Sequence, residues 1–262
     1  MLSFKEAIPI KTFYTSEVAK LVGLHPNTVR KYEEWGLIPK PKRASNNYRI
    51  YTNFHIDIIM LARTAFQIEL IHSNLRRTMV AMIQSAAKQN FIEAHKYLEL
   101  YQQTIDAELI KAKNAAYISE KLLLPQRELP STKEYSRQSV ATSLGITVDS
   151  LRNWELNGLV HSKRKSNGHR YYTKHDLRII QIIQVLREAK YSLEAILHLL
   201  NEFSINPKIN ITTTLDQPNM ESEIISVCDQ LITSLKQGKK NANELKTMLI
   251  ELETHHYSQL ND

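Results

Sequence analysis

Val29-Arg30-Lys31-Tyr32-Glu33-Glu34-Trp35-Gly36-Leu37-Ile38 decides the fold of this chain, because the sequence contains a second version of it. That version is Leu151-Arg152-Asn153-Trp154-Glu155-Leu156-Asn157-Gly158-Leu159-Val160. The match extends outward, from Val18-Ala19 against Val140-Ala141 to Arg49-Ile50-Tyr51-Thr52 against Arg170-Tyr171-Tyr172-Thr173. Matches between so many residue types indicate one structural unit used twice, which is too few copies for a solenoid.

The positive charge of the chain is concentrated on these two copies. The 262 residues carry a net charge of +7. Residues 25–52 contain six Lys/Arg and two Asp/Glu, residues 147–174 contain the same numbers, and each window therefore carries +4. One such window could be an ordinary solvated face. Two windows in register favour a surface that meets a polyanion.

Composition excludes several other classes of protein. The single cysteine, Cys228, excludes an intrachain disulfide and favours a reducing compartment. Residues 1–13 lack the apolar core of a signal peptide, and the most apolar stretch, 177–186, is interrupted by Arg178 and two glutamines. We therefore expect a soluble, cytoplasmic protein. Since the sequence offers no acid pair, nucleophile constellation or phosphate loop, we do not expect an enzyme.

Each copy has the pattern of a helix-turn-helix followed by a hairpin. In the first copy a short helix ends at Gly23, and a second helix starts around Pro26 and stops at Gly36. Residues 37–51 then predict two short strands around a basic turn, which is the wing of a winged helix. Residues 136–172 repeat this order, and their turn at Ser166-Asn167-Gly168 is a stronger hairpin signal.

Two long helices are predicted, one after each copy. Apolar or small residues recur by threes and fours from Phe91 to Leu122, and again from Ile224 to Leu252, as in a coiled-coil seam. Gly238 lies in the second seam and predicts a bend or local fraying, because glycine weakens a helix by roughly 1 kcal/mol relative to alanine.

These patterns divide the chain into six segments. They are a first winged-helix domain at 1–88, a long helix at 89–124, a linker at 125–133, a second winged-helix domain at 134–203, a flexible connector at 204–219 and a second long helix at 220–258. The predicted fold class is mainly α, with two winged helix-turn-helix domains that are each followed by a long helix.

Each copy resembles the winged helix of MerR-type regulators. The family pattern Leu/Val-Arg-x-aromatic-Glu-x-x-Gly-Leu stands at 29–37 and 151–159, and its wing motif stands at Gly168-His169-Arg170-Tyr171-Tyr172. The first copy departs from the pattern at Asn47, where glycine is usual, but asparagine tolerates left-handed backbone. The resemblance covers nearly the whole chain, since family members also carry a long helix after the winged helix.

The resemblance implies a transcription regulator whose two long helices pair as an antiparallel coiled coil and hold two winged helices on successive faces of double-stranded DNA. The implied mechanism distorts a promoter so that RNA polymerase can engage both of its elements. Because one chain here holds both copies, we expect a monomer that forms an internal pseudo-dimer on an imperfect palindrome. The alternative is an architectural or recombination accessory protein. Family members that sense metals use cysteine pairs, which this chain lacks, and we expect no metal or other cofactor.

The candidate DNA contacts fall on the second helix and the wing of each copy. Candidates for base edges are Asn27, Thr28, Lys31, Ser150 and Asn153, with Arg30 and Arg152 on phosphates or supporting a base contact. Candidates for the backbone are Lys42, Arg43, Arg49, Lys163, Arg164, His169 and Arg170.

Several residues keep two interpretations. Tyr32 and Trp154 either touch phosphate or pack behind the helix, and Tyr51 and Tyr172 face either the DNA or the core. Asp149 either accepts a hydrogen bond from cytosine or caps its helix. The two second helices differ in sequence, which predicts unlike half-sites.

Overall fold

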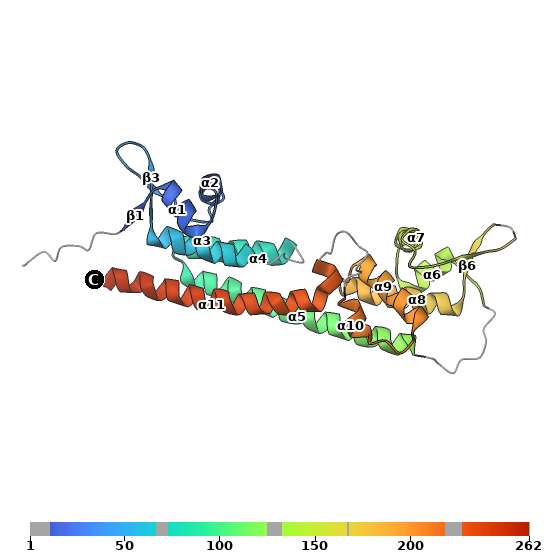
Figure 1. Ribbon diagram of the computed structural model, residues 1–262. Helices are drawn as coiled ribbons and strands as arrows, with labels where there is room; N and C mark the ends of the chain where they lie inside the picture. Colours follow the sequence, from blue (N-terminus) through green and yellow to red (C-terminus); the bar gives the residue numbers. More distant parts are fainter. Residues whose placement is uncertain (1–10, 67–72, 125–132, 167, 218–226, 262) are drawn as a thin grey trace, which may run out of the picture. The chain divides into compact units, whose positions relative to one another are not determined.

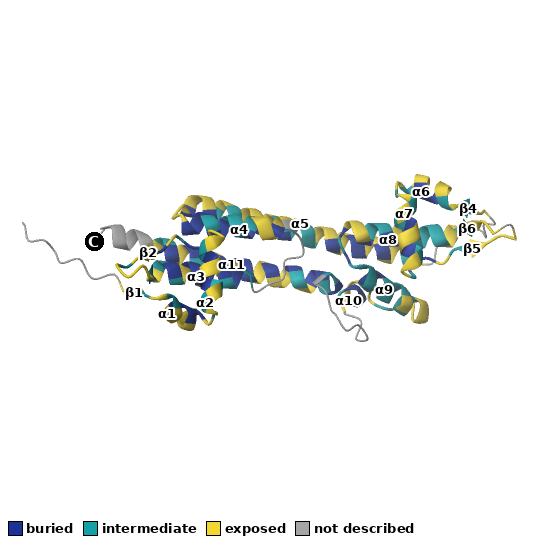
Figure 2. Cartoon of the chain, turned by 90° about the horizontal axis from the view of Figure 1, so that it is seen from above, coloured by how far each residue is buried: buried dark blue, intermediate teal, exposed yellow. Residues whose placement is uncertain are grey.

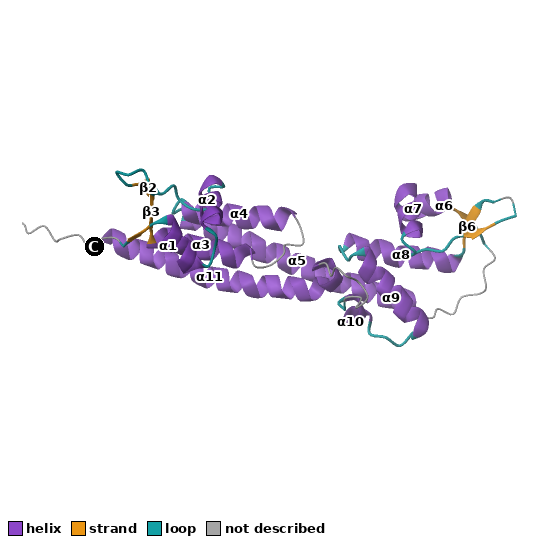
Figure 3. Cartoon of the chain, turned by 45° about the horizontal axis from the view of Figure 1, so that its top comes forward, coloured by secondary structure: helices purple, strands orange, loops and turns teal. Residues whose placement is uncertain are grey.

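The computed structural model describes residues 11–66, 73–124, 133–166, 168–217 and 227–261. The chain divides into two compact units: residues 1–105 together with 237–262, and residues 106–236. Helices predominate, and the strands form two small sheets (Figure 3). Among the described residues, no helix combines the length and the apolar character that crossing a membrane requires. The predicted fold class, mainly helical with two winged helices each followed by a long helix, is confirmed.

The first winged helix comprises α1 (Thr15–Val22), α2 (Pro26–Glu34), β2 (Lys42–Arg43) and β3 (Arg49–Thr52). A further strand, β1 (Thr12–Phe13), precedes α1 and gives an antiparallel sheet in the order β1-β3-β2. The sequence analysis predicted no strand at this position, and residues 1–10 lie outside the described part. Two residues are too few to produce a visible alternation of apolar and polar positions.

The second winged helix repeats this order with β4 (Tyr135–Ser136), α6 (Arg137–Leu144), α7 (Val148–Leu156), β5 (Lys163–Arg164) and β6 (Arg170–Tyr172). Its sheet order is β4-β6-β5. In both copies the two short helices lie on one side of the helix that follows the wing (Figure 1). The helix-turn-helix and the wing hairpin that the sequence predicted are therefore present twice.

Left-handed backbone at matching positions sets the turns of both copies. Gly23 and Gly145 end the first helix of each copy with φ of 64° and 65°. At the tips of the wings Asn47 has φ of 66° and Gly168 has φ of 79°. Asparagine therefore does take the place of glycine in the first wing, because its side chain tolerates this region better than most.

Equivalent apolar residues fill the core of each winged helix. The fully or almost fully buried pairs are Val18/Val140, Ala19/Ala141, Val29/Leu151, Tyr32/Trp154, Leu37/Leu159, Ile38/Val160 and Tyr51/Tyr172. Since these side chains come from both helices and from the wing, burying them fixes the second helix against the sheet. Each side chain of this size contributes about 1.5–3 kcal/mol on burial.

In the first unit, the winged helix packs with α3 (Asn53–Phe66), α4 (Ser73–Ala87), the first half of α5 (Phe91–Leu123) and most of α11 (Leu231–Asn261). His95 on α5 is 2.9 Å from Glu253 on α11, and Gln102 donates to Asn243 over 3.1 Å, so the two segments run antiparallel. Buried and exposed residues alternate along α11 (Figure 2).

The second unit contains α8 (Lys174–Glu188), α9 (Leu193–Ile205), α10 (Ile211–Leu215), the 3-10 turn η1 (Val227–Gln230), the second half of α5 and the start of α11. Lys190 pairs with Glu108 of α5 at 2.8 Å. The buried hydroxyl of Tyr191 donates to the carbonyl of Ala112 over 3.3 Å. This half of α5 therefore packs against the helices of the second winged helix.

Two expectations for the connecting regions were wrong. The connector predicted at 204–219 contains the end of α9 and the helix α10, which Asn210 caps through Thr213 N. The fraying expected at Gly238 is absent, since α11 is continuous there. A Cβ added at Gly238 would lie 3.1 Å from Ile105 Cδ1. Glycine therefore fits the close packing at this point, since an added Cβ would need Ile105 to shift by a few tenths of an ångström. The linker predicted at 125–133 lies outside the described residues except for Lys133.

Asn241 provides a test of the contact between α11 and the first winged helix. Its buried side chain donates to the carbonyl of Thr64, near the end of α3, over 2.8 Å. Asn241→Ala should lower the free energy of unfolding of the first unit by about 1–3 kcal/mol, because the buried carbonyl loses its donor. Urea unfolding followed by Trp35 fluorescence, in a Trp154→Phe background, measures the change. The matched control is Asn243→Ala at an exposed position. Equal effects of both variants would contradict the prediction.

Candidate nucleic-acid interface

The second helix of each winged helix is the element expected to enter the DNA groove, and each is capped by the residue before it. His25 Nδ1 accepts from Asn27 N over 3.2 Å at the start of α2. Thr147 Oγ1 accepts from Ser150 N over 3.0 Å at the start of α7. Thr147, and not Asp149, is therefore the cap of α7, and the capping interpretation of Asp149 was wrong.

The exposed face of α2 carries polar and basic side chains. Asn27, Arg30 and Lys31 are exposed, and Thr28 is half-buried. Arg30 Nη1 donates to Asn27 Oδ1 over 2.8 Å. The three exposed residues that the sequence predicted thus lie on one face of α2, and a hydrogen bond connects Arg30 with Asn27 on that face.

The equivalent face of α7 is also polar. Arg152 and Asn153 are exposed, whereas Ser150 is half-buried and lies 2.7 Å from Thr147 Oγ1. The side chain of Asn157 donates to Asn153 Oδ1 over 2.9 Å. The two faces therefore hold their polar groups differently, although the backbone elements correspond.

In both wings an arginine closes the turn. Arg43 Nη1 donates to the carbonyl of Asn47 over 3.0 Å, and Arg164 Nη1 donates to the carbonyl of Gly168 over 3.4 Å. Both arginines remain exposed, as do the predicted wing residues Lys42, Lys163 and His169. The wings thus present cations on hairpins whose shape these same arginines support.

A glutamate in each second helix joins that helix to the wing. Glu33 Oε2 accepts from Arg49 Nε over 2.6 Å. Glu155 Oε2 accepts from Arg170 Nη1 over 3.2 Å and from Arg137, while Glu155 Oε1 accepts from the hydroxyl of Tyr172 over 2.7 Å. The Glu155 side chain is only 8% exposed. Arg49 and Arg170, expected on the DNA backbone, are therefore engaged within the protein.

The sequence prediction did not assign a role to Glu33, Glu155 or Arg137. A signal for two of them was present, because the glutamate and the wing arginine recur together in both copies. Arg137 gave none, since the first copy has Thr15 at that position.

The electrostatics of Glu155 follow from these partners. Burial alone would raise the pKa of its carboxyl, but hydrogen bonds from Tyr172 and Ser162 and the charges of Arg137 and Arg170 hold this pKa below its ordinary value. Burial and donation to Glu155 raise the pKa of Tyr172. The group is therefore a carboxylate at neutral pH and fixes the orientation of its donors.

The four aromatic candidates lie in the core. Tyr51 and Tyr172 are 0% exposed, so their inclusion among DNA-contacting side chains was wrong. Tyr32 and Trp154 are 7% and 8% exposed, which favours packing behind the helix over contact with phosphate. Alternation along the short wing strands could not decide this, because three or four residues show too little of the pattern.

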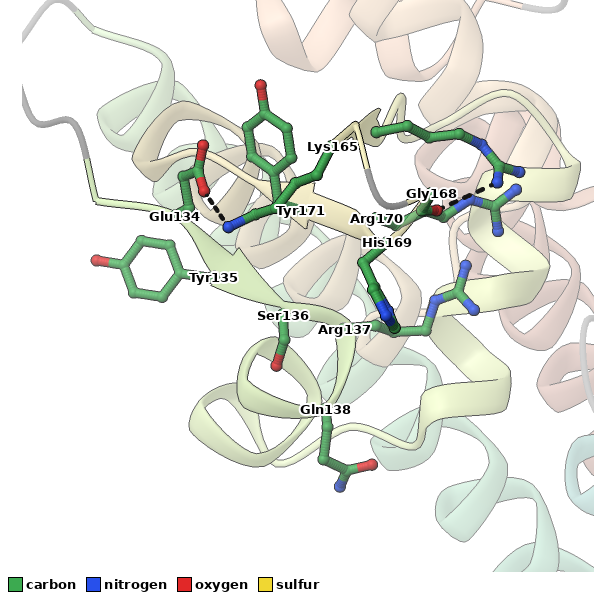
Figure 4. A pocket seen from close by; sticks show the side chains of 11 residues that line it. Glu134, Tyr135, Ser136, Arg137, Gln138, Lys165, Gly168, His169, Arg170 and Tyr171 are labelled. Atoms are coloured by element: carbon green, nitrogen blue, oxygen red, sulfur yellow. Dashed lines mark hydrogen bonds and ion pairs between the residues drawn. The ribbon is translucent and has the colours of Figure 1, made fainter.

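A hollow beside the second wing collects basic side chains (Figure 4). It lies between the start of α6 and the hairpin, and Glu134 pairs with Lys165 at 2.5 Å on its rim. The basic side chains lining it are those of Arg137, Arg164, Lys165, His169 and Arg170. Within the described residues, no three His, Cys, Asp or Glu side chains gather as metal ligands.

An exposed polar helix beside a basic hairpin, built twice on buried apolar cores, defines a winged helix-turn-helix protein. Residues 14–51 match the model of the MerR family regulatory protein, and residues 135–202 match that of the MerR HTH family regulatory protein. Each of the two winged helices of this chain thus matches a helix-turn-helix model of the MerR family.

Curated relatives match parts of the chain. The HTH-type transcriptional regulator CueR of Escherichia coli O6:H1 is 45% identical over 53 residues, which are 20% of this chain and 39% of CueR. The HTH-type transcriptional regulator ZntR homolog of Haemophilus influenzae is 30% identical over 82 residues, which are 31% of this chain and 59% of that protein. The chain thus spans less than two thirds of these relatives. No solved structure matches it significantly.

Glu33 pairs with one arginine and Glu155 with two, which predicts that their substitution lowers the free energy of unfolding by different amounts. Glu155→Gln should lower the free energy of unfolding of the second unit by about 3 kcal/mol, because two arginines lose a nearly buried counter-charge. Glu33→Gln, which breaks one ion pair, should cost about 1–2 kcal/mol in the first unit. Urea unfolding measures both, with Trp154 as reporter in Trp35→Phe and Trp35 as reporter in Trp154→Phe.

The contribution of Glu155 to the free energy of unfolding should depend on pH. Since the folded pKa of Glu155 is lowered from 4.5, its stabilisation is present above pH 4.5 and is lost as the pH falls through the folded value. Glu155→Gln should therefore lose less stability on acidification than the parent protein. An unchanged slope would contradict the assigned role of the carboxylate.

Proposed function

We propose that this protein is a sequence-specific, double-stranded DNA-binding transcription regulator. The observation that carries the proposal is the repeated combination of an exposed polar second helix and a cationic hairpin. A helix of this size fits the major groove, and cations on a hairpin beside it reach the phosphate backbone. The relatives named as transcriptional regulators support the same assignment.

We further infer that one chain acts as a pseudo-dimer. In the first unit, α11, which follows the second winged helix in the chain, contacts α3 and α5 through Asn241, Asn243 and Glu253. In the second unit, α5, which follows the first winged helix, contacts the end of α8 through Glu108 and Ala112. Each winged helix therefore packs with the long helix of the other copy. This reciprocal exchange is the relation expected across a two-fold interface, and it supports pairing of the long helices as an antiparallel coiled coil.

On this proposal the two winged helices bind an imperfect palindrome and distort it so that RNA polymerase holoenzyme engages the promoter. Such distortion costs several kcal/mol, which contacts by both winged helices offset. The alternative is an architectural or recombination accessory protein with the same domains. Footprints at promoters, together with altered transcript levels of the adjacent genes after deletion, support regulation. Footprints confined to recombination sites support the alternative.

Lys42 and Lys163 test the contacts of the wings with DNA phosphates. Both are exposed on β2 and β5, away from the interactions that hold the turns. Lys42→Ala/Lys163→Ala should weaken binding to every duplex and reduce the slope of log K against log salt by about 1.8, because each phosphate contact contributes about 0.9. Fluorescence anisotropy across a salt series measures the slope.

A matched control removes the same charge elsewhere. Lys240 and Lys246 are exposed on α11, outside both wings. Lys240→Ala/Lys246→Ala should leave the salt slope close to that of the parent protein. If the two double variants change the slope equally, the wings do not make the proposed contacts.

The pseudo-dimer predicts a monomer whose long helices pair within one chain. Sedimentation velocity of the DNA-free protein should therefore give the mass of one chain, 30.4 kDa. In a Cys228→Ser background, cysteines at Gln102 and Asn243 should be bridged by a bifunctional maleimide, because these side chains are hydrogen-bonded. The bridged product should keep the monomer mass under denaturing conditions. Bridged products of twice that mass would show pairing between chains and overturn the pseudo-dimer.

A further inference from the structure

In each winged helix the second helix, α2 or α7, is the proposed recognition helix. Its second residue carries an exposed polar side chain whose chemistry differs between the two copies. Asn27 holds this position in α2 (Pro26–Glu34), and Asp149 holds it in α7 (Val148–Leu156). Both residues are exposed. The repeat thus places an amide and a carboxylate at the same point of two helices that otherwise share their fold.

Neither side chain is used to cap its helix. His25 and Thr147 already accept the hydrogen bonds from the first-turn amides. In the part of the chain that the structure describes, the Asp149 carboxylate accepts no hydrogen bond and pairs with no cation. Asp149 lies in the first turn of α7, where a carboxylate stabilises the helix dipole, but this role leaves its side chain exposed and able to accept hydrogen bonds from a partner.

The two side chains present opposite hydrogen-bonding groups outward. Asn27 Oδ1 accepts from Arg30 Nη1 over 2.8 Å, which leaves the amide NH2 of Asn27 to donate. The carboxylate of Asp149 can only accept. The face of α2 therefore offers donors from Asn27, Arg30 and Lys31, whereas the face of α7 combines the donor Arg152 with an acceptor at its N-terminal end.

A carboxylate at this position cannot bind phosphate, because like charges repel. In the major groove the group that it can bind is an exocyclic amine, and cytosine N4 is the usual partner of Asp and Glu there. We propose that Asp149 is a specificity-determining residue that accepts a hydrogen bond from cytosine N4 in the half-site read by the second winged helix. This inference rests on the proposed function. It explains how two winged helices of one fold would read unlike half-sites.

Selection from a pool of random duplexes, followed by anisotropy on single-base variants of the selected site, tests this proposal. The wild-type protein should select cytosine at one position of one half-site. Asp149→Asn should reduce the preference for cytosine over the other bases there at least about fivefold, because a good contact to a base edge discriminates by about that factor or more. Preference in the other half-site should remain.

The control variant is Glu34→Gln, which removes one exposed negative charge from the last turn of the other recognition helix. It should raise affinity for all duplexes without changing base preference. If Asp149→Asn behaves in the same way, the carboxylate only repels DNA and the assignment is wrong. It is equally wrong if the selected half-sites contain no cytosine. A wild-type protein that selects no duplex would instead refute the proposed function itself.

Discussion

The ion pair between a helix glutamate and a wing arginine is the constraint on which each winged helix depends. Glu33 with Arg49, and Glu155 with Arg170, connect the second helix to the last strand of the wing. The two glutamates lie near the C-terminal end of their helices, and their side chains are only 12% and 8% exposed. An ion pair that loses this much water requires good geometry and additional hydrogen bonds to be stable. The ion pair therefore helps to hold the second helix, with its exposed polar face, in a fixed orientation relative to the wing.

Much of this architecture could be predicted from the sequence because it is local and occurs twice. The turn glycines Gly23 and Gly145 follow from a backbone conformation that few other residues adopt. Helix spacing identified α5, and the bounds of the two wings followed from their turn residues. Because the same residue types recur in both copies, chance is excluded as their origin. The weaker turn signal at Asn47 could therefore be interpreted from the stronger one at Gly168.

The remaining features depend on contacts that sequence spacing does not encode. The fold decides which acceptor lies close to an arginine. Arg49 and Arg170 donate hydrogen bonds to Glu33 and Glu155 within the protein. The ring of Tyr51 packs against His55 of α3, with 5.5 Å between the ring centroids, and the hydroxyl of Tyr172 donates to Glu155 of α7. The effect of Gly238 likewise depends on Ile105, a residue of another helix. In each case a tertiary neighbour overrides the local propensity.

Joining both copies in one chain has a consequence that a homodimer cannot share. In a symmetric dimer every substitution occurs twice, whereas here a change in one winged helix leaves the other intact. The two copies have already diverged in this way. Arg137 adds a further partner to Glu155, where the first copy has Thr15. The second residue of the recognition helix is Asn27 in one copy and Asp149 in the other. The two winged helices share their buried cores but differ in their exposed side chains. Recognition of an asymmetric duplex requires this combination, because each winged helix can then adapt to its own half-site without changing the other winged helix.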